Sequence, residues 1–297
     1  MRYSRSCGIV GSLVCLLAAV GPYAAGSGST GAHPGHRENL PEVRGEIVAV
    51  ADDVLELKID EGDGSVRRFR IGSGDASIYK AGDRVRGRIA RSGAEARLDT
   101  IWPDDPVQNA IVGSAKDAFR RDTVSRGSKA FRGIGEVAPD FTLYNERGAV
   151  VSLRSYRGRM VVINFIFSRC AMPRMCPAAT SRMSMLQTEA RKAGVDTLQL
   201  LSISFDPDYD TPGILAGYSK NYGVDSDGFS FLTGDGGVVK DVLKQFGVDV
   251  RYEGGTFNHT MSTILLDKHG RIVFRRDGSR WEVGDFLDRI VSGAKDN

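Results

Sequence analysis

Two cysteines, Cys170 and Cys176, are the residues of this chain best suited to redox or metal chemistry. They lie in the segment SRCAMPRMCP with five residues between them. This spacing allows the sulfurs to form a disulfide or to converge on one metal ion. A purely structural disulfide is the weaker interpretation, because so small a loop gains little stability from chain entropy. The two-residue spacer of thioredoxin-like motifs is absent, which favours a site that opens to hold a metal over general dithiol exchange.

The residues around the pair predict where the second sulfur lies. Residues 160–167 (MVVINFIF) form an apolar run of the kind found in strands that are buried on both faces. Pro177 follows Cys176 and suits the first position of a helix, which we expect over residues 177–193. A sulfur at a helix amino terminus is favoured as thiolate by the helix dipole and the free N–H groups. The pair is therefore expected to include a reactive sulfur of low pKa.

Histidine is the natural third ligand if the metal is copper, because imidazole binds copper in either oxidation state. His33 and His36 fall in a polar segment and are treated as inert, and His269 lies in a turn sequence. His259 lies at the mouth of an expected strand, where a lone histidine is more often structural.

Methionine thioethers are soft ligands that suit Cu(I). Met172 and Met175 lie inside the cysteine loop, and packing and ligation are equally favoured for them. Met183, Met185 and Met261 are expected to fill the core.

Composition and the amino terminus limit the classes of partner. The chain has 297 residues, enough for two domains, with 40 basic and 37 acidic residues and no long basic run, so nucleic acid is excluded as a partner. Residues 1–25 carry Arg2 and Arg5 before an apolar stretch, the pattern of a secretory signal peptide. An uncleaved anchor is the alternative, since the stretch approaches the ~20 residues that span a bilayer. We therefore expect an exported, periplasmic protein that contacts the membrane only through this segment.

The rest of the chain divides into four parts that differ in composition and in the spacing of apolar residues. Residues 26–43 are rich in Gly, Ser and Pro, which indicates a flexible linker. Residues 44–103 alternate apolar and polar positions in five short runs, which predicts a small all-β barrel-like domain. Residues 104–134 are expected to form a connector with a short helix. Residues 135–297 alternate strands with helices, which predicts an α/β domain of the thioredoxin plan. Its further elements are expected at residues 198–205, 211–222, 236–246, 260–266, 272–275 and 281–291.

Several segments resemble, in the same order, those of the Sco/SenC family. They are GEVAPDFTL at residues 135–143, YRG at 156–158, the Cys…Cys-Pro loop, DPDYDTP at 206–212, and His259-Thr260 leading to a strand that ends in Leu266-Asp267. The resemblance covers about residues 135–291, and the DPDYDTP string is its most specific part.

The resemblance implies a function and a set of site residues. Cys170, Cys176 and His259 would bind one copper ion per chain as Cu(I) or Cu(II), with Asp206 as an acidic residue beside them. Family members are similar in delivering copper to, or reducing the cysteines of, the binuclear copper centre of cytochrome c oxidase. The implied partners are that copper-site subunit or another cuproprotein, together with thiol reductants. Five residues separate the two cysteines here, whereas three do so in the usual family loop, and this difference would alter the geometry of a bound metal.

The role of the amino-terminal domain and two alternative functions can also be assessed from the sequence. Residues 81–89 and 98–101 resemble the barrel of periplasmic copper-efflux metallochaperones, but residues 44–103 contain no His, Met or Cys, which favours a docking or spacer module. A thiol-disulfide oxidoreductase without stable metal binding is the alternative function. A peroxiredoxin-like peroxidase is disfavoured, because Pro173 and Thr180 stand in the wrong order around the cysteines. A metallochaperone is thus favoured over an enzyme.

Overall fold

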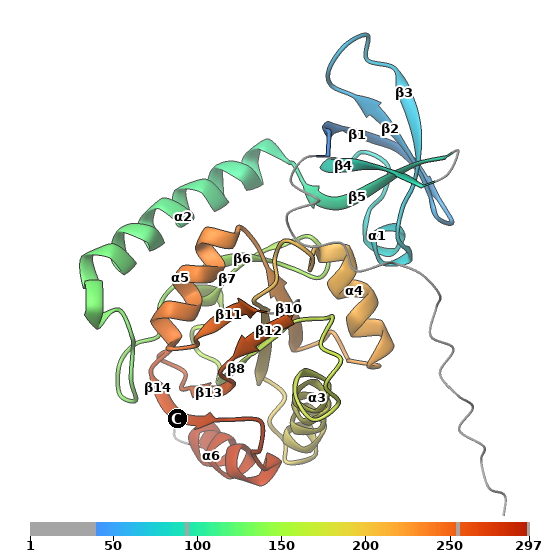
Figure 1. The fold of residues 1–297 in the computed structure, drawn as a ribbon. Coiled ribbons are helices and arrows are strands. Elements are labelled where there is room, and N and C mark those ends of the chain that lie inside the picture. The colour runs from blue at the N-terminus through green and yellow to red at the C-terminus, as the bar shows by residue number, and fades with distance from the viewer. Residues whose placement is uncertain (1–39, 93–94, 254–255, 296–297) are drawn as a thin grey trace, which may run out of the picture. The chain divides into compact units, whose positions relative to one another are not determined.

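The structure is a computed structural model that describes residues 40–92, 95–253 and 256–295. The expected signal segment, most of the linker, His33 and His36 lie outside the described residues. Within them, five strands close into a barrel and seven others form an open sheet, as Figure 1 shows. The predicted fold class, a thioredoxin-like domain preceded by a small β-barrel, is confirmed.

The barrel has the strand order β1-β2-β3-β5-β4. Its elements are β1 (Glu42–Ala51), β2 (Val54–Ile59), β3 (Val66–Arg70), α1 (Ser73–Ile78), β4 (Arg84–Ser92) and β5 (Glu95–Pro103). Alternate residues point inward, as Leu55 and Leu57 do on β2, so each strand buries one apolar row. A single parallel pair, Arg70 with Arg97, closes the barrel between β3 and β5. This order, with a helix between the third and fourth strands, is that of an OB-fold.

The second sheet has the order β14-β13-β8-β9-β10-β6-β7. Its strands are β6 (Thr142–Asn145), β7 (Val150–Ser152), β8 (Val161–Ile166), β9 (Gln199–Ser204), β10 (Phe229–Thr233), β13 (Ser262–Leu266) and β14 (Ile272–Asp277). The neighbours β8, β9 and β10 are parallel, and all their residues are buried. Parallel strands that are covered on both faces consist of nearly continuous apolar runs, and such runs in the sequence correctly predicted β8 and β9.

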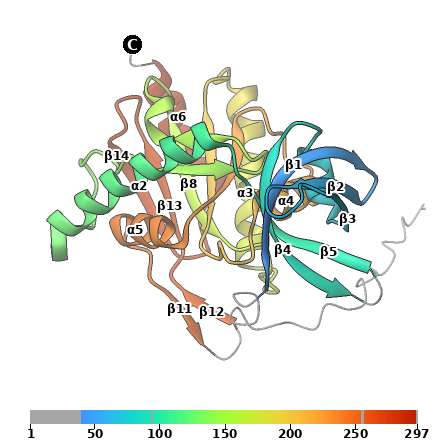
Figure 2. The ribbon, with the colours of Figure 1, turned by 90° about the horizontal axis from the view of Figure 1, so that it is seen from above.

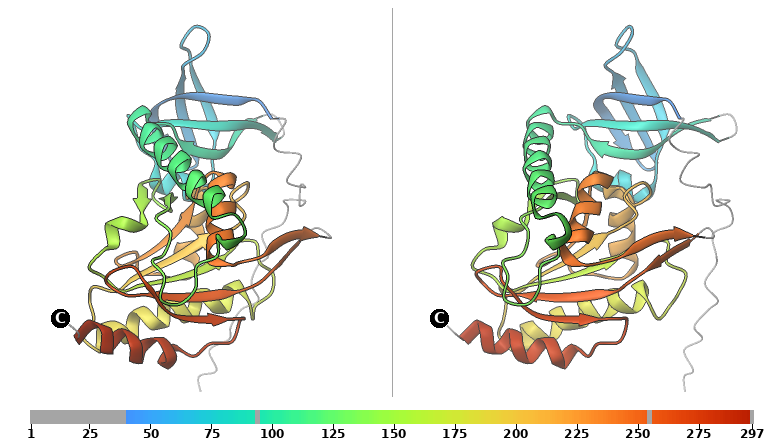
Figure 3. Two further views of the ribbon diagram at one scale, coloured as in Figure 1. Left: turned by 90° about the vertical axis from the view of Figure 1, so that its left-hand side faces the viewer. Right: turned by 60° about the vertical axis from the view of Figure 1, so that its left-hand side comes forward.

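Helices connect and cover this sheet. They are α3 (Cys176–Lys192), α4 (Pro212–Asn221), α5 (Gly236–Phe246) and α6 (Val283–Lys295). Both α3 and α6 lie on one face of the sheet and α5 on the other, as Figure 3 shows. Their apolar sides meet the sheet in one core, in which Phe165 packs against Phe246 with ring centroids 5.8 Å apart.

The connector contains a much longer helix than expected, α2 (Pro106–Arg126), followed by a 3-10 turn at Gly127–Lys129. Asp105 caps it by accepting a hydrogen bond from the Gln108 N–H, and Pro106 starts its first turn. Only Phe119 and Thr123 are buried along its described length. Because so few apolar residues recur at the spacing of a helix, the sequence pattern did not predict the full length of α2.

A short hairpin, β11 (Val250–Glu253) with β12 (Thr256–His259), forms its own two-stranded sheet. Figure 2 shows it extending away from the larger sheet. The strand expected at residues 260–266 begins only at Ser262, and His259 is instead the last residue of β12. The candidate ligand therefore belongs to the hairpin rather than to the central sheet.

Candidate thiol and metal site

The two cysteines lie where β8 gives way to α3. Cys170 follows β8 in a loop, and Cys176 is the first residue of α3, directly before Pro177 as predicted. Both are free thiols in the structure. Cys176 is fully buried at 0 % exposure, whereas Cys170 is half-buried. Only the first thiol is therefore open to partners.

The two thiols have opposite acidities. A hydrogen bond from the Cys176 thiol, with help from the backbone and the nearby His259, lowers the pKa of Cys170 to about 6. Donating that bond, together with burial, raises the pKa of Cys176. The expectation of one low-pKa sulfur is confirmed, but it is Cys170 and not the cysteine at the helix terminus. Burial and the hydrogen bond outweigh the helix dipole at Cys176.

The imidazole of His259 is held by aromatic rings. Its centroid lies 4.6 Å from that of Phe205 and 5.9 Å from that of Phe167. Nδ1 lies 3.2 Å from the Thr260 carbonyl oxygen, to which it can donate as the N–H tautomer. Nε2 is buried and has no hydrogen-bond partner among the described residues. A carbonyl that fixes the tautomer and leaves Nε2 with a free lone pair is the usual arrangement around a metal-ligating histidine.

The structure brings the two thiols into direct contact and places the His259 side chain near Cys170. In the part of the chain that is described, no group of three or more His, Cys, Asp or Glu side chains stands close enough together to hold a metal. Of the predicted ligand set, the cysteines are thus assembled as a pair and His259 lies beside them.

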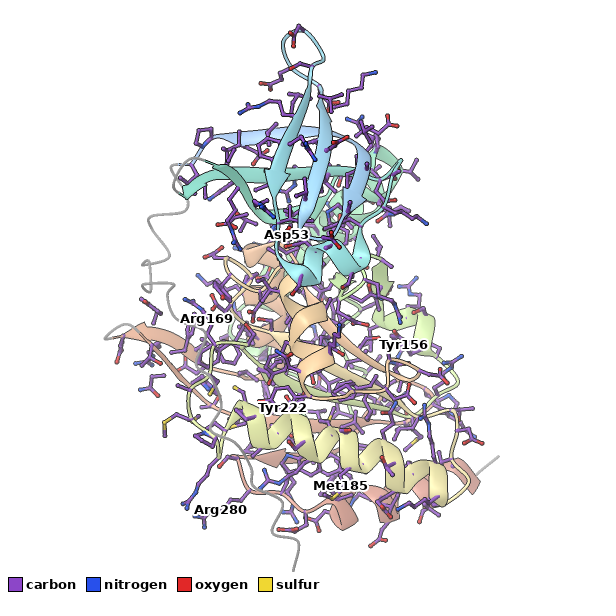
Figure 4. The ribbon with its side chains drawn as sticks, turned by 90° about the vertical axis from the view of Figure 1, so that its right-hand side faces the viewer. Asp53, Tyr156, Arg169, Met185, Tyr222 and Arg280 are labelled. Carbon is purple, nitrogen blue, oxygen red and sulfur yellow. The ribbon has the colours of Figure 1, made fainter. Side chains whose placement is uncertain are left out.

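Asp206 lies at the site through Arg169, the residue before Cys170. The Arg169 guanidinium donates to Asp206 Oδ2 at 2.6 and 3.0 Å and stacks over the Tyr209 ring at 4.3 Å (Figure 4). Burial and the neighbouring Asp210 raise the pKa of Asp206 to about 7, against the opposing effect of Arg169. The predicted acidic residue therefore holds the loop in place rather than facing the sulfurs directly.

Asp210, which the sequence analysis did not single out, anchors the same loop. Its carboxylate is fully buried and accepts hydrogen bonds from the Ser168 N–H at 3.0 Å, the Ser168 hydroxyl and the Ser204 hydroxyl. Ser168 opens the cysteine loop and Ser204 ends β9. The signal that could have found Asp210 was its place in the DPDYDTP string.

The methionines divide between core and site. Met183 is in the core as expected, and Met261 is buried, but Met185 is 56 % exposed on α3, so its expected core position is wrong (Figure 4). Met172 is 59 % exposed, and Met175 is half-buried before Cys176. His269 is exposed in the turn between β13 and β14, as predicted.

Comparison with known proteins identifies the family to which the carboxy-terminal part of the chain is similar. Residues 130–290 match the model of the SCO1/SenC family. The SCO1 protein homologue of Bacillus subtilis is 32% identical over 142 residues, covering 46% of this chain and 72% of that protein. The mitochondrial SCO2 homologue of Bos taurus is 31% identical over 199 residues, covering 62% of this chain and 72% of that protein.

A solved structure agrees with these sequence matches. The crystal structure of a SCO1/SenC family lipoprotein from Bacillus anthracis matches with a TM-score of 0.51 at 26% identity. The match covers 56% of this chain and 99% of that one. By sequence and fold, the chain belongs to the SCO1/SenC family.

Proposed function

We propose that this protein is an exported copper-binding metallochaperone. It binds one copper ion through Cys170, Cys176 and His259. It delivers that copper to the binuclear copper site of cytochrome c oxidase, or reduces the cysteines of that site. Copper is here the cargo of the protein.

One observation carries the proposal: a thiolate-forming Cys170 in contact with a buried thiol, beside an imidazole whose Nε2 has no partner among the described residues. Two soft sulfur donors and one imidazole suit copper. The Cys170 thiolate is present without a bound metal, so only the Cys176 thiol must lose a proton when the ion binds. Membership of the SCO1/SenC family supports the same cargo and client.

Export rests on the amino-terminal segment, which lies outside the described residues. None of the helices in the described ranges combines the length and the apolar character needed to cross a bilayer. We propose that residues 1–25 direct the chain to the periplasm, as a cleaved signal or as an anchor.

Copper stoichiometry and visible absorption of the reduced, purified protein test the proposal, in a chain carrying Cys7→Ser and Cys15→Ser so that Cys170 and Cys176 are its only thiols. We expect one copper per chain and a thiolate-to-copper charge-transfer band. The band should weaken in His259→Ala and vanish in the Cys170→Ser/Cys176→Ser double variant. His269→Ala is the matched control, because this histidine is exposed in a turn, and it should leave the band unchanged.

The alternative is a thiol-disulfide oxidoreductase without stable metal binding, which the accessible Cys170 thiolate favours. In that reaction Cys170 attacks a client disulfide and Cys176 then closes a Cys170–Cys176 disulfide, so that two electrons pass to the client. Wild-type protein that retains no copper but cycles readily between dithiol and disulfide would replace the metallochaperone proposal with this one.

A further inference from the structure

A groove of about 490 Å³ adjoins the thiol site from the side of His259. Met175, His259 and Met261 line part of it, and they come from two stretches of chain that lie far apart in the sequence. Met175 directly precedes α3, His259 ends β12, and Met261 lies between β12 and β13. The fold thus gathers two thioethers and one imidazole around a single space.

These two methionines differ from those that fill the core. Met160 and Met183 belong to the large apolar cluster of the domain, whereas neither Met175 nor Met261 is among its members in the described residues. Exposed Met172 does not line the groove, although it lies in the same loop. Met175 is half-buried and Met261 is 8 % exposed, and both line the groove, so these are the two methionines that a ligand entering it would meet.

The charges in the groove allow a small cation to bind. The guanidinium of Arg275 is the cationic group among its described lining residues, and its donors are engaged: Nε donates to Asp277 at 2.7 Å and a terminal N–H donates to the Phe246 carbonyl. Asp277, which also lines the groove, offsets that charge. Thioether and imidazole donors together select Cu(I) among the biological metals.

We propose that this groove is an entry site for Cu(I), held by the thioethers of Met175 and Met261 with the His259 imidazole, before the ion passes to Cys170 and Cys176. The inference rests on the proposed copper cargo and adds the path by which the ion arrives. Met175 adjoins Cys176 in the chain, and His259 both lines the groove and belongs to the proposed copper site, so the imidazole is common to both sets of donors.

The transfer is a ligand exchange in which copper stays Cu(I). Bonds from copper to the two thioether sulfurs break while bonds to the Cys170 and Cys176 sulfurs form. Both cysteines bind the ion as thiolates, and any proton that a thiol carries passes to water. No electron acceptor is needed.

The test measures Cu(I) binding without the thiols. The full chain with all four cysteines replaced, Cys7→Ser/Cys15→Ser/Cys170→Ser/Cys176→Ser, is titrated anaerobically with Cu(I) against a colorimetric Cu(I) chelator. We expect one weakly bound ion, whose affinity falls at least tenfold when Met175→Leu and Met261→Leu are added. X-ray absorption should show sulfur and nitrogen neighbours in the first protein and lose the sulfur in the second. Leu conserves volume, and the urea midpoint of each variant verifies its fold.

Met185→Leu in the same background is the matched control, because this exposed methionine lies on α3 outside the groove. It should leave the affinity unchanged. Equal Cu(I) affinity with and without the two groove methionines, or no binding at all in the thiol-free protein, would overturn the entry site. Thiolate-bound copper in the wild type would then still support the proposed function. Conversely, a methionine-dependent ion in a protein whose thiols take up no copper would support the groove and reject the function.

Discussion

The buried Cys176 thiol donates a hydrogen bond to the sulfur of Cys170, and this bond sets which of the two cysteines is ionised. We expect Cys176→Ala to raise the pKa of Cys170 from about 6 toward the ordinary thiol value of about 8.5. Cys176→Ser retains a donor and should raise it less. The rate of alkylation of Cys170 against pH measures this, with peptide mass spectrometry to separate Cys170 from Cys7 and Cys15. Identical profiles for wild type and Cys176→Ala would show that the hydrogen bond has no such role.

Arg169 partly offsets the negative charge of buried Asp206, so its removal should act in a pH-dependent way. The pKa of Asp206 in the fold is about 7, above the ordinary value of about 4, so this group's contribution to stability falls as pH rises between the two. Arg169→Ala should therefore lower the free energy of unfolding by about 1–3 kcal/mol above pH ~7 and by less near pH ~5. Urea unfolding at both pH values measures the difference.

Arg174→Ala is the control for that experiment, because Arg174 is an exposed arginine of the same loop. It should change stability by less than about 0.5 kcal/mol at either pH. A loss in Arg169→Ala that did not depend on pH would count against the role assigned to Asp206.

Asp210 should be the most sensitive polar residue near the site. Asp210→Ala would leave the Ser168 N–H and the hydroxyls of Ser168 and Ser204 without their acceptor in a buried place. We expect a loss of about 2–4 kcal/mol and faster hydrogen exchange at the Ser168 amide. Exposed Asp208→Ala is the matched control and should be nearly neutral. If the two variants unfolded at the same urea concentration, Asp210 would not be the anchor of the loop.

Gly247 ends α5 in the left-handed conformation, with φ 66°. A Cβ atom there would lie 2.5 Å from the Phe131 ring and would also strain the backbone. Gly247→Ala should therefore destabilise the domain by about 1–3 kcal/mol, measured by urea unfolding. Gly284→Ala in α6, where the space is open and φ is ordinary, should be neutral or slightly stabilising. Similar effects of both changes would contradict this account of the helix end.

The sequence was most informative where burial is complete. The apolar run before Cys170 and the proline after Cys176 located the end of β8 and the start of α3, and with them the cysteine loop. The acidity of each thiol depends instead on contacts within a folded loop, which no residue spacing encodes. Asp210 acquires its role only because β8 and β9 are parallel neighbours, which brings Ser168 and Ser204 to one carboxylate.

The parts that went unpredicted are exposed. The strands of the β11–β12 hairpin have mostly exposed residues and are only four residues long, so an alternation such as Val-Arg-Tyr-Glu at Val250–Glu253 is at the lower limit of what marks a strand. The helix α2 buries only Phe119 and Thr123 and therefore resembled a polar connector. Met185 was assigned to the core from its type alone, although its position on α3 faces water.

The hairpin places the three candidate donors on two supports, which meet where the His259 ring packs against Phe167 and Phe205. Cys170 and Cys176 are fixed by the junction of β8 with α3, whereas His259 ends a hairpin tied down by the pairing of Thr260 with Asp249. A displacement of the hairpin alone would withdraw the imidazole and leave both sulfurs where they are. The number of protein ligands to a cargo ion would then drop from three to two with no change in the thiol pair. Release of the ion to a client would in that case be controlled by movement of the β11–β12 hairpin and not by oxidation of the cysteines.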